Sequence, residues 1–129
     1  MSLRLTAYVV GLLASLSCAG LQAAEPNPLG NWQTATGESR FKVTRCGTGE
    51  ELCARLIWLR DDARTAENLA LLNNFVLTGA RQVAANSWAG TVVYDGDTYA
   101  GTVVFKSNDV MTVKSCSGIL CHSYDLHRI

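Results

Sequence analysis

The sequence predicts an all-β fold, a small up-and-down antiparallel β-barrel with one short helix, after a cleaved signal peptide. Apolar and polar residues alternate with period two along most segments after residue 30. Turn-forming residues separate these segments at short intervals, and a single stretch has helical spacing. Consecutive hairpin-linked strands favour a barrel over a parallel sheet, which would need repeated crossover helices. A β-sandwich is the alternative that the pattern leaves open.

Residues 1–24 have the organisation of a secretory signal peptide. Arg4 supplies a positive charge, residues 5–16 are almost entirely apolar or small, and further small residues lead up to Ala24. A membrane anchor is the alternative, but the apolar stretch is shorter than the roughly 20 residues that a spanning helix needs. We therefore expect cleavage after Ala24 and no membrane span in the mature protein.

The mature chain is then one domain over residues 25–129. Lipid anchoring at Cys18 is not expected, because Ser15 stands where an upstream leucine would support it. Of the eleven Lys and Arg residues only Arg4 is removed, so ten remain against eleven Asp and Glu. This balance, with no basic run, argues against nucleic acid or an anionic membrane surface as the partner.

The first expected strands begin at Gly30, Ser39 and Cys53. In residues 39–46, Phe41 and Val43 share one face while the residues between them are polar. In residues 53–59, Leu56 and Trp58 share one face, and Ile57 makes the strand apolar on the other face too.

A helix is expected over residues 63–73, where apolar residues recur at helical spacing. Asp61 or Asp62 is placed to cap its start. Two short strands, over residues 75–77 and 82–84, are expected to follow around a Thr-Gly turn.

The remaining strands are expected over residues 88–94, 97–105, 110–116 and 120–128. The first two are joined by Asp95-Gly96, a strong two-residue hairpin signal. The total is seven to nine short strands in hairpin order, a number that a small barrel accommodates.

Four cysteines remain after signal removal, an even number that favours two disulfides in an exported domain. The local pattern favours Cys46–Cys53 and Cys116–Cys121, because each pair brackets a turn-like segment between strands. The alternative is a metal site or redox pair, but those motifs place two residues between cysteines, and these gaps are longer.

No arrangement of residues supports catalysis, so we expect no enzyme. His122 and His127 lie five positions apart on one strand and therefore face opposite sides, which precludes a shared metal. Ser123, Asp125 and His127 have the residue types of a catalytic triad, but side chains two apart on a strand point in parallel. Neither a metal nor a cofactor is expected, because no phosphate loop, dinucleotide fingerprint or calcium loop is present.

The aromatic residues expected inside the barrel are the candidate ligand contacts: Trp58, Trp88, Tyr99, Phe105 and Tyr124. An eight-stranded barrel is just wide enough to be packed solid or to hold one small ligand. Because the strands are short, we expect no large open cavity. A filled core is the alternative use of these five side chains.

Gly30-Asn31-Trp32 near the first strand and Arg128 near the last are similar to the lipocalin and calycin superfamily. The resemblance implies that Trp32 closes the barrel floor and that Arg128 packs over its indole ring. A cation over a tryptophan face contributes about 0.5–2 kcal/mol.

A wider set of motifs resembles the bacterial domain-of-unknown-function family 2147 over essentially the whole mature chain. Besides Gly30-x-Trp32 and the four cysteines, the set is Leu56-Ile57-Trp58-Leu59, Leu77-Thr78-Gly79, Trp88-x-Gly90, Tyr94 and Thr98-Tyr99-x-Gly101. The resemblance implies a small exported lipocalin-like barrel without an assigned activity. Ser115 and Leu126 depart from the family pattern, where glycine and tryptophan are common, which leaves any shared pocket chemistry in doubt.

Two hypotheses of function follow. The first is a non-enzymatic protein of the bacterial periplasm whose barrel binds a small apolar or amphipathic molecule. The second is an inhibitor-like module that binds an envelope protein or cell-wall material through the disulfide-bracketed tips at residues 47–52 and 117–120, with a filled barrel as the scaffold. The sequence predicts neither the ligand nor the oligomeric state.

Overall fold

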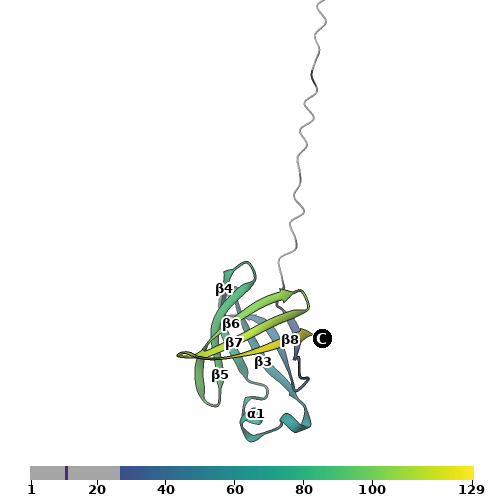
Figure 1. Cartoon of the computed structure of the whole chain (residues 1–129), viewed down its shortest axis with the longest axis vertical. Helices are drawn as coiled ribbons and strands as arrows, with labels where there is room; N and C mark the ends of the chain where they lie inside the picture. The colour runs from purple at the N-terminus through teal and green to yellow at the C-terminus, as the bar shows by residue number, and fades with distance from the viewer. Residues whose placement is uncertain (1–10, 12–26) are drawn as a thin grey trace, which may run out of the picture.

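The computed structural model describes Gly11 and residues 27–129 (Figure 1). Apart from Gly11, the predicted signal peptide lies outside the described residues, and so does Cys18. Within the described part, no helix is long and apolar enough to cross a membrane.

Eight antiparallel strands pair in chain order and close into one barrel, because β1 also pairs with β8. The strands are β1 (Gly30–Thr34), β2 (Ser39–Cys46), β3 (Glu51–Leu59), β4 (Phe75–Ala84), β5 (Ser87–Tyr94), β6 (Asp97–Ser107), β7 (Val110–Ser117) and β8 (Leu120–Arg128). The predicted up-and-down barrel is confirmed, and closure excludes the sandwich.

The expected helix is interrupted and shorter. A 3₁₀ turn, η1 (Asp61–Ala63), precedes α1 (Ala66–Leu71). Thr65, rather than Asp61 or Asp62, caps α1, since its side-chain oxygen accepts a hydrogen bond from the amide of Asn68 at 3.2 Å. The two aspartates fall instead in the 3₁₀ turn, which the apolar spacing alone does not distinguish from the first turn of an α-helix.

The two short strands expected around Thr78-Gly79 are in fact one strand, β4. Gly79 adopts φ +58° and the pairing of β4 with β5 shifts between Thr78 and Arg81. These features describe a bulge, in which glycine takes the left-handed conformation without leaving the strand. The expected chain reversal at Thr78-Gly79 is therefore wrong, because the glycine forms a bulge within one continuous strand.

The barrel has two unlike ends. The closed end carries the residues just before β1, the hairpin turns β2–β3, β4–β5 and β6–β7, and the end of β8. The open end carries the β1–β2, β5–β6 and β7–β8 turns and the segment 60–74, which includes α1 at the bottom of Figure 1.

The buried core follows this division. The main cluster gathers around Trp32, Trp88, Phe105, Met111 and Leu126. A smaller cluster of Leu56, Leu59 and Ala63 lies beneath the helical segment at the open end.

Candidate ligand-binding cavity

A cavity of about 960 Å³ occupies the barrel interior and reaches the open end. Its walls come from most of the strands and from the segment that contains α1, and they include Phe41, Leu56, Val76, Val92 and Val113. The volume lies at the upper end of the range of small-molecule sites, about 300–1,000 Å³. The expectation of no large cavity is therefore wrong, and so is the alternative of a filled interior.

The tightest aromatic packing of the interior lies at one end, where Trp32, Trp88 and Phe105 pack together. Farther along β5 and β6, the residues that line the cavity include Val92, Tyr99 and Val103. A Cβ atom at Gly90 would lie 2.7 Å from the backbone of β4, so β4 and β5 approach each other too closely at this point for any residue but glycine. Strand length alone did not reveal this uneven distribution.

Trp32 forms the floor of the barrel. Its side chain is fully buried, and its ring meets Phe105 edge-on at a centroid distance of 5.7 Å. The indole N–H donates a hydrogen bond to the carbonyl of Pro28 at 2.9 Å, so the polar atom is satisfied. The indole thus ties the segment before β1 to the core.

Arg128 covers the outer face of this floor, as the lipocalin resemblance implies. Its guanidinium carbon lies 4.3 Å from the centroid of the Trp32 ring. The same guanidinium donates to the carbonyls of Asn27, Leu29 and Asn108 at 2.6, 2.8 and 3.0 Å. Arg128 therefore links the end of β8, the segment before β1 and the β6–β7 turn across the closed end.

The five aromatic residues predicted as interior ligand contacts occupy three different environments. Trp88 and Phe105 are buried in the packed closed end, with ring centroids 5.4 Å apart, and do not line the cavity. Tyr99 and Tyr124 line the cavity. Trp58 lies off the cavity.

The position of Trp58 corrects the prediction. The pairing of β2 with β3 shifts between Arg40 and Phe41, which pair with Trp58 and Leu56 respectively. This bulge reverses the alternation, so Leu56 and Leu59 line the cavity while the Trp58 ring lies under the guanidinium of Arg40 at 4.3 Å. An inserted residue within the apolar run of residues 56–59 leaves no trace in its hydrophobic pattern.

Sequence reasoning also missed the contribution of the helical segment to the cavity. Ala63, Asn68 and Leu71 line it, together with Val76 at the start of β4. The apolar spacing that predicted the helix could have indicated this contribution, because an amphipathic helix turns its apolar face toward the protein interior.

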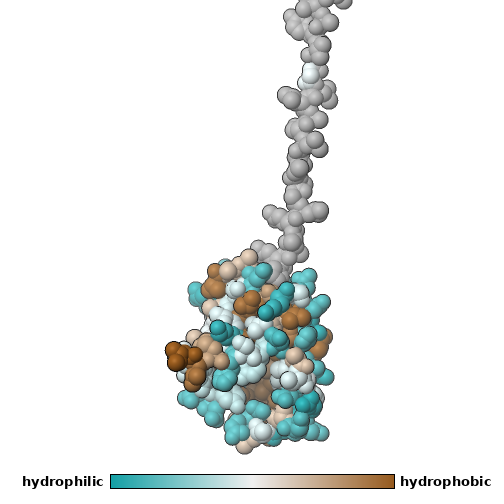
Figure 2. Space-filling view, viewed as in Figure 1, coloured by the Kyte–Doolittle hydropathy of each residue, from teal (hydrophilic) through white to brown (hydrophobic). Residues whose placement is uncertain are grey.

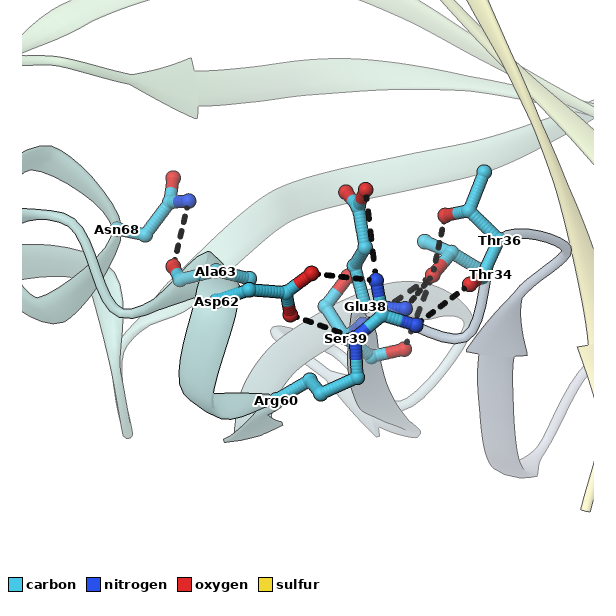
Figure 3. A network of polar contacts seen from close by, with 8 residues as sticks. All are labelled: Thr34, Thr36, Glu38, Ser39, Arg60, Asp62, Ala63 and Asn68. Atoms are coloured by element: carbon cyan, nitrogen blue, oxygen red, sulfur yellow. Dashed lines mark hydrogen bonds and ion pairs between the residues drawn. The ribbon is translucent and has the colours of Figure 1, made fainter.

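A polar network holds this helical segment to the β1–β2 turn at the rim (Figure 3). The guanidinium of Arg60 binds both carboxylate oxygens of Asp62 at 2.6 and 2.8 Å and donates to the carbonyl of Thr36 at 3.0 Å. Glu38 lies 3.9 Å from the same guanidinium. The hydrogen bonds from Arg60 lower the pKa of Asp62, and those to Asp62 raise the pKa of Arg60.

The hydroxyl of Thr34 organises the turn itself. It accepts hydrogen bonds from the backbone amides of Glu38 and Ser39 at 3.0 and 3.2 Å. Because Thr34 and Ser39 also line the cavity, these hydrogen bonds fix the shape of its mouth at this turn.

Both predicted disulfides are present and lie at opposite ends of the barrel. Cys46–Cys53 joins β2 to β3 at the closed end, and Cys116–Cys121 joins β7 to β8 at the open end. Each links two strands next to their hairpin turn, so each fixes the register of that hairpin.

The β7–β8 hairpin has an exposed apolar tip. Ile119 is 99% exposed and Leu120 is 70% exposed. In Figure 2 this tip projects as a brown knob at the left of the molecule. Leu120 also lines the cavity, so the tip adjoins its mouth.

The histidines face opposite sides, as their spacing predicts. His122 pairs with Ser115, and both line the cavity, whereas His127 pairs with Gln33 on β1 and with Val110 and is absent from the lining. Asp125 accepts a hydrogen bond from the hydroxyl of Thr112 at 2.7 Å. Among residues 27–129 and Gly11, no three His, Cys, Asp or Glu side chains gather as metal ligands would.

Comparison with known proteins agrees with this architecture. The profile of a family described as "Uncharacterized protein conserved in bacteria (DUF2147)" matches residues 30–128. A solved structure described as "Protein HP1028 from the human pathogen Helicobacter pylori belongs to the lipocalin family" is similar in fold. It superposes with a TM-score of 0.61 at 18% identity, over 80% of this chain and 83% of that one. No curated protein matches the chain.

Proposed function

The chain belongs to the bacterial DUF2147 family, and we propose that its lipocalin-like barrel binds a small apolar or amphipathic molecule without catalysing a reaction. The observation that carries the proposal is the cavity of about 960 Å³, closed at one end by Trp32 and Arg128 and open at the other. An apolar pocket with a few polar groups at its mouth is the usual form of a small-molecule site.

The polar groups are placed to orient an amphiphile rather than to react with it. Val43, Val103 and Met111 line the deep part of the cavity, while Glu38 and His122 lie among its lining residues at the open end. A chain that enters tail first would bury its apolar part against the former and leave its head group near the latter.

The proposal is tested with a fluorescent neutral probe, N-phenyl-1-naphthylamine, titrated into the oxidised protein. We expect saturable enhancement of its emission, displaced by a single-chain amphiphile. Val92→Trp, which fills the cavity, should abolish the enhancement, whereas Thr91→Trp, one residue along on the outward face of β5, should leave it. No saturable enhancement with the unsubstituted protein would count against ligand binding.

We further propose that the mature protein works in the bacterial periplasm. Its two disulfides indicate an oxidising, extracytoplasmic location. The signal-like composition of residues 1–24 supports export across the cytoplasmic membrane. Fractionation of expressing cells should place a protein beginning at Glu25 in the periplasmic fraction, and recovery of the full-length chain from the cytoplasm would contradict the proposal.

A second candidate function is docking to another envelope component, favoured by the exposed Ile119 and Leu120 on a disulfide-stapled tip. This hypothesis assumed a filled barrel, which the cavity contradicts. The tip and the cavity can nevertheless both contact a partner, because Leu120 belongs to both. The test is capture of a partner from periplasmic extract. The double variant Ile119→Ser/Leu120→Ser should lose the partner, and Thr48→Ala at the other disulfide-linked tip should keep it.

A further inference from the structure

We infer that the cavity selects amphiphiles whose head group carries no negative charge, with cationic heads favoured over uncharged ones and anionic heads disfavoured. The inference rests on the proposed function and names the class of ligand for the same site. Two independent features support it: the charged residues that line the cavity and the distribution of charge around its mouth.

The lining contains more acidic than basic side chains. Among the described residues that line the cavity, none is a lysine or an arginine, the acidic ones are Glu38 and Asp125, and the one histidine is His122. A cavity that takes a carboxylate or phosphate usually supplies a guanidinium, ammonium or cluster of N–H donors for it.

The basic residues of the walls are directed elsewhere. Arg40 lies over the ring of Trp58 at 4.3 Å, and Arg55 lies over the ring of Phe75 at 4.4 Å, in both cases off the cavity. Arg60, at the start of the segment 60–74, already binds Asp62 and lies beside Glu38. None of the three is free to meet a head group.

The turns at the open end carry an excess of negative charge. Within residues 35–38, 60–74 and 95–97, the only basic side chains are Arg60 and Arg64. The acidic side chains in the same stretches are Glu38, Asp61, Asp62, Glu67, Asp95 and Asp97. The remaining described residues carry the reverse imbalance, with eight basic and four acidic side chains, so the charges of the chain are separated between the mouth and the rest.

The size of the effect follows from screened charges in water. Two unit charges about 10 Å apart interact weakly in water, and about 0.1 M salt reduces the interaction further. Summed over an excess of four negative charges, a cationic head should bind roughly tenfold more tightly than an anionic head on the same chain at about 0.1 M salt. The ratio should grow at about 0.01 M salt and approach one at 1 M.

The experiment compares three amphiphiles with the same sixteen-carbon chain: hexadecyltrimethylammonium, hexadecylphosphocholine and palmitate. Each is used below its micelle concentration to displace N-phenyl-1-naphthylamine from the oxidised protein. We expect the affinities to fall in that order. Palmitate binding as tightly as hexadecyltrimethylammonium, or more tightly, would overturn the inference while leaving ligand binding intact.

Two double variants distinguish the effect of acidic residues at the mouth from the effect of the net charge of the protein. Asp95→Asn/Asp97→Asn removes two exposed acids at the mouth, and asparagine suits the positive φ of Asp95. We expect the cation-to-anion ratio to fall to about threefold. Glu50→Gln/Asp109→Asn makes the same charge change at the closed end and should leave the ratio unchanged.

Two other outcomes are decisive. A ratio that both double variants lower equally would overturn the role of the mouth. If none of the three amphiphiles displaces the probe or binds directly, the inference fails together with the proposed function.

Discussion

The two ends of this barrel use similar strands for opposite purposes. At the closed end, Trp32, Phe105 and Trp88 pack against one another, and Arg128 on β8 holds the segment before β1 over them. At the open end the inward side chains, Phe41 and Tyr99 among them, surround a cavity of about 960 Å³. Because one continuous sheet forms both ends, the packed end must supply the stability that the hollow end lacks. Mutations of equal size should therefore have unequal effects at the two ends.

The largest effect is expected for Trp32→Ala. It removes a fully buried ring, its edge-on contact with Phe105 and the cation–π contact of Arg128. Such truncations cost about 3–5 kcal/mol. Urea denaturation should show this loss, whereas Trp58→Ala on the outer wall should cost less than half as much. Equal losses would mean that Trp32 is not the centre of the packed end.

Opening the disulfides should come next. In the chain-entropy model, loops of seven and five residues are each worth about 2 kcal/mol. Cys53 is buried, whereas Cys121 is exposed, so Cys46→Ala/Cys53→Ala should cost more than Cys116→Ala/Cys121→Ala. Calorimetry of both variants measures the difference, and the reverse order would show that the open end contributes more to stability than its packing suggests.

Enlarging a side chain contrasts the two ends most directly. Ala80 is fully buried near the β4 bulge, so Ala80→Leu should overpack the barrel and cost about 1–3 kcal/mol. Ser115 lines the cavity, so Ser115→Leu has room and should cost less than about 1 kcal/mol while weakening probe binding. A strongly destabilised Ser115→Leu would show that the cavity is smaller than the structure indicates.

The sequence predicted most of the fold but only part of this contrast. Period-two alternation and turn residues located the strands, and the cysteine spacing gave both disulfides. Two of the errors arose at bulges. Near Gly79 the bulge was taken for a chain reversal, and near Trp58 one inserted residue changes which face the side chain takes. Alternation reports that a residue faces inward, but whether it meets another side chain or empty space depends on strand tilt and on the side chains across the barrel.

The smallest expected effect concerns the rim, where Arg60 and Asp62 meet with side chains 43% and 64% exposed. Hydrogen bonds from Arg60 lower the pKa of Asp62 below its ordinary value of 3.8. The pair therefore stabilises the folded state above pH 3.8, and this contribution is lost as the pH falls through the lowered pKa. Thermal melts should show a slightly lower Tm for Asp62→Asn at pH 6, with the difference vanishing at the acid end. Because exposed pairs are screened, 1 M salt should also remove most of the difference. A difference that persists in acid would assign the effect to the shape of the 3₁₀ turn, and the rim would then owe its form to backbone geometry instead of charge.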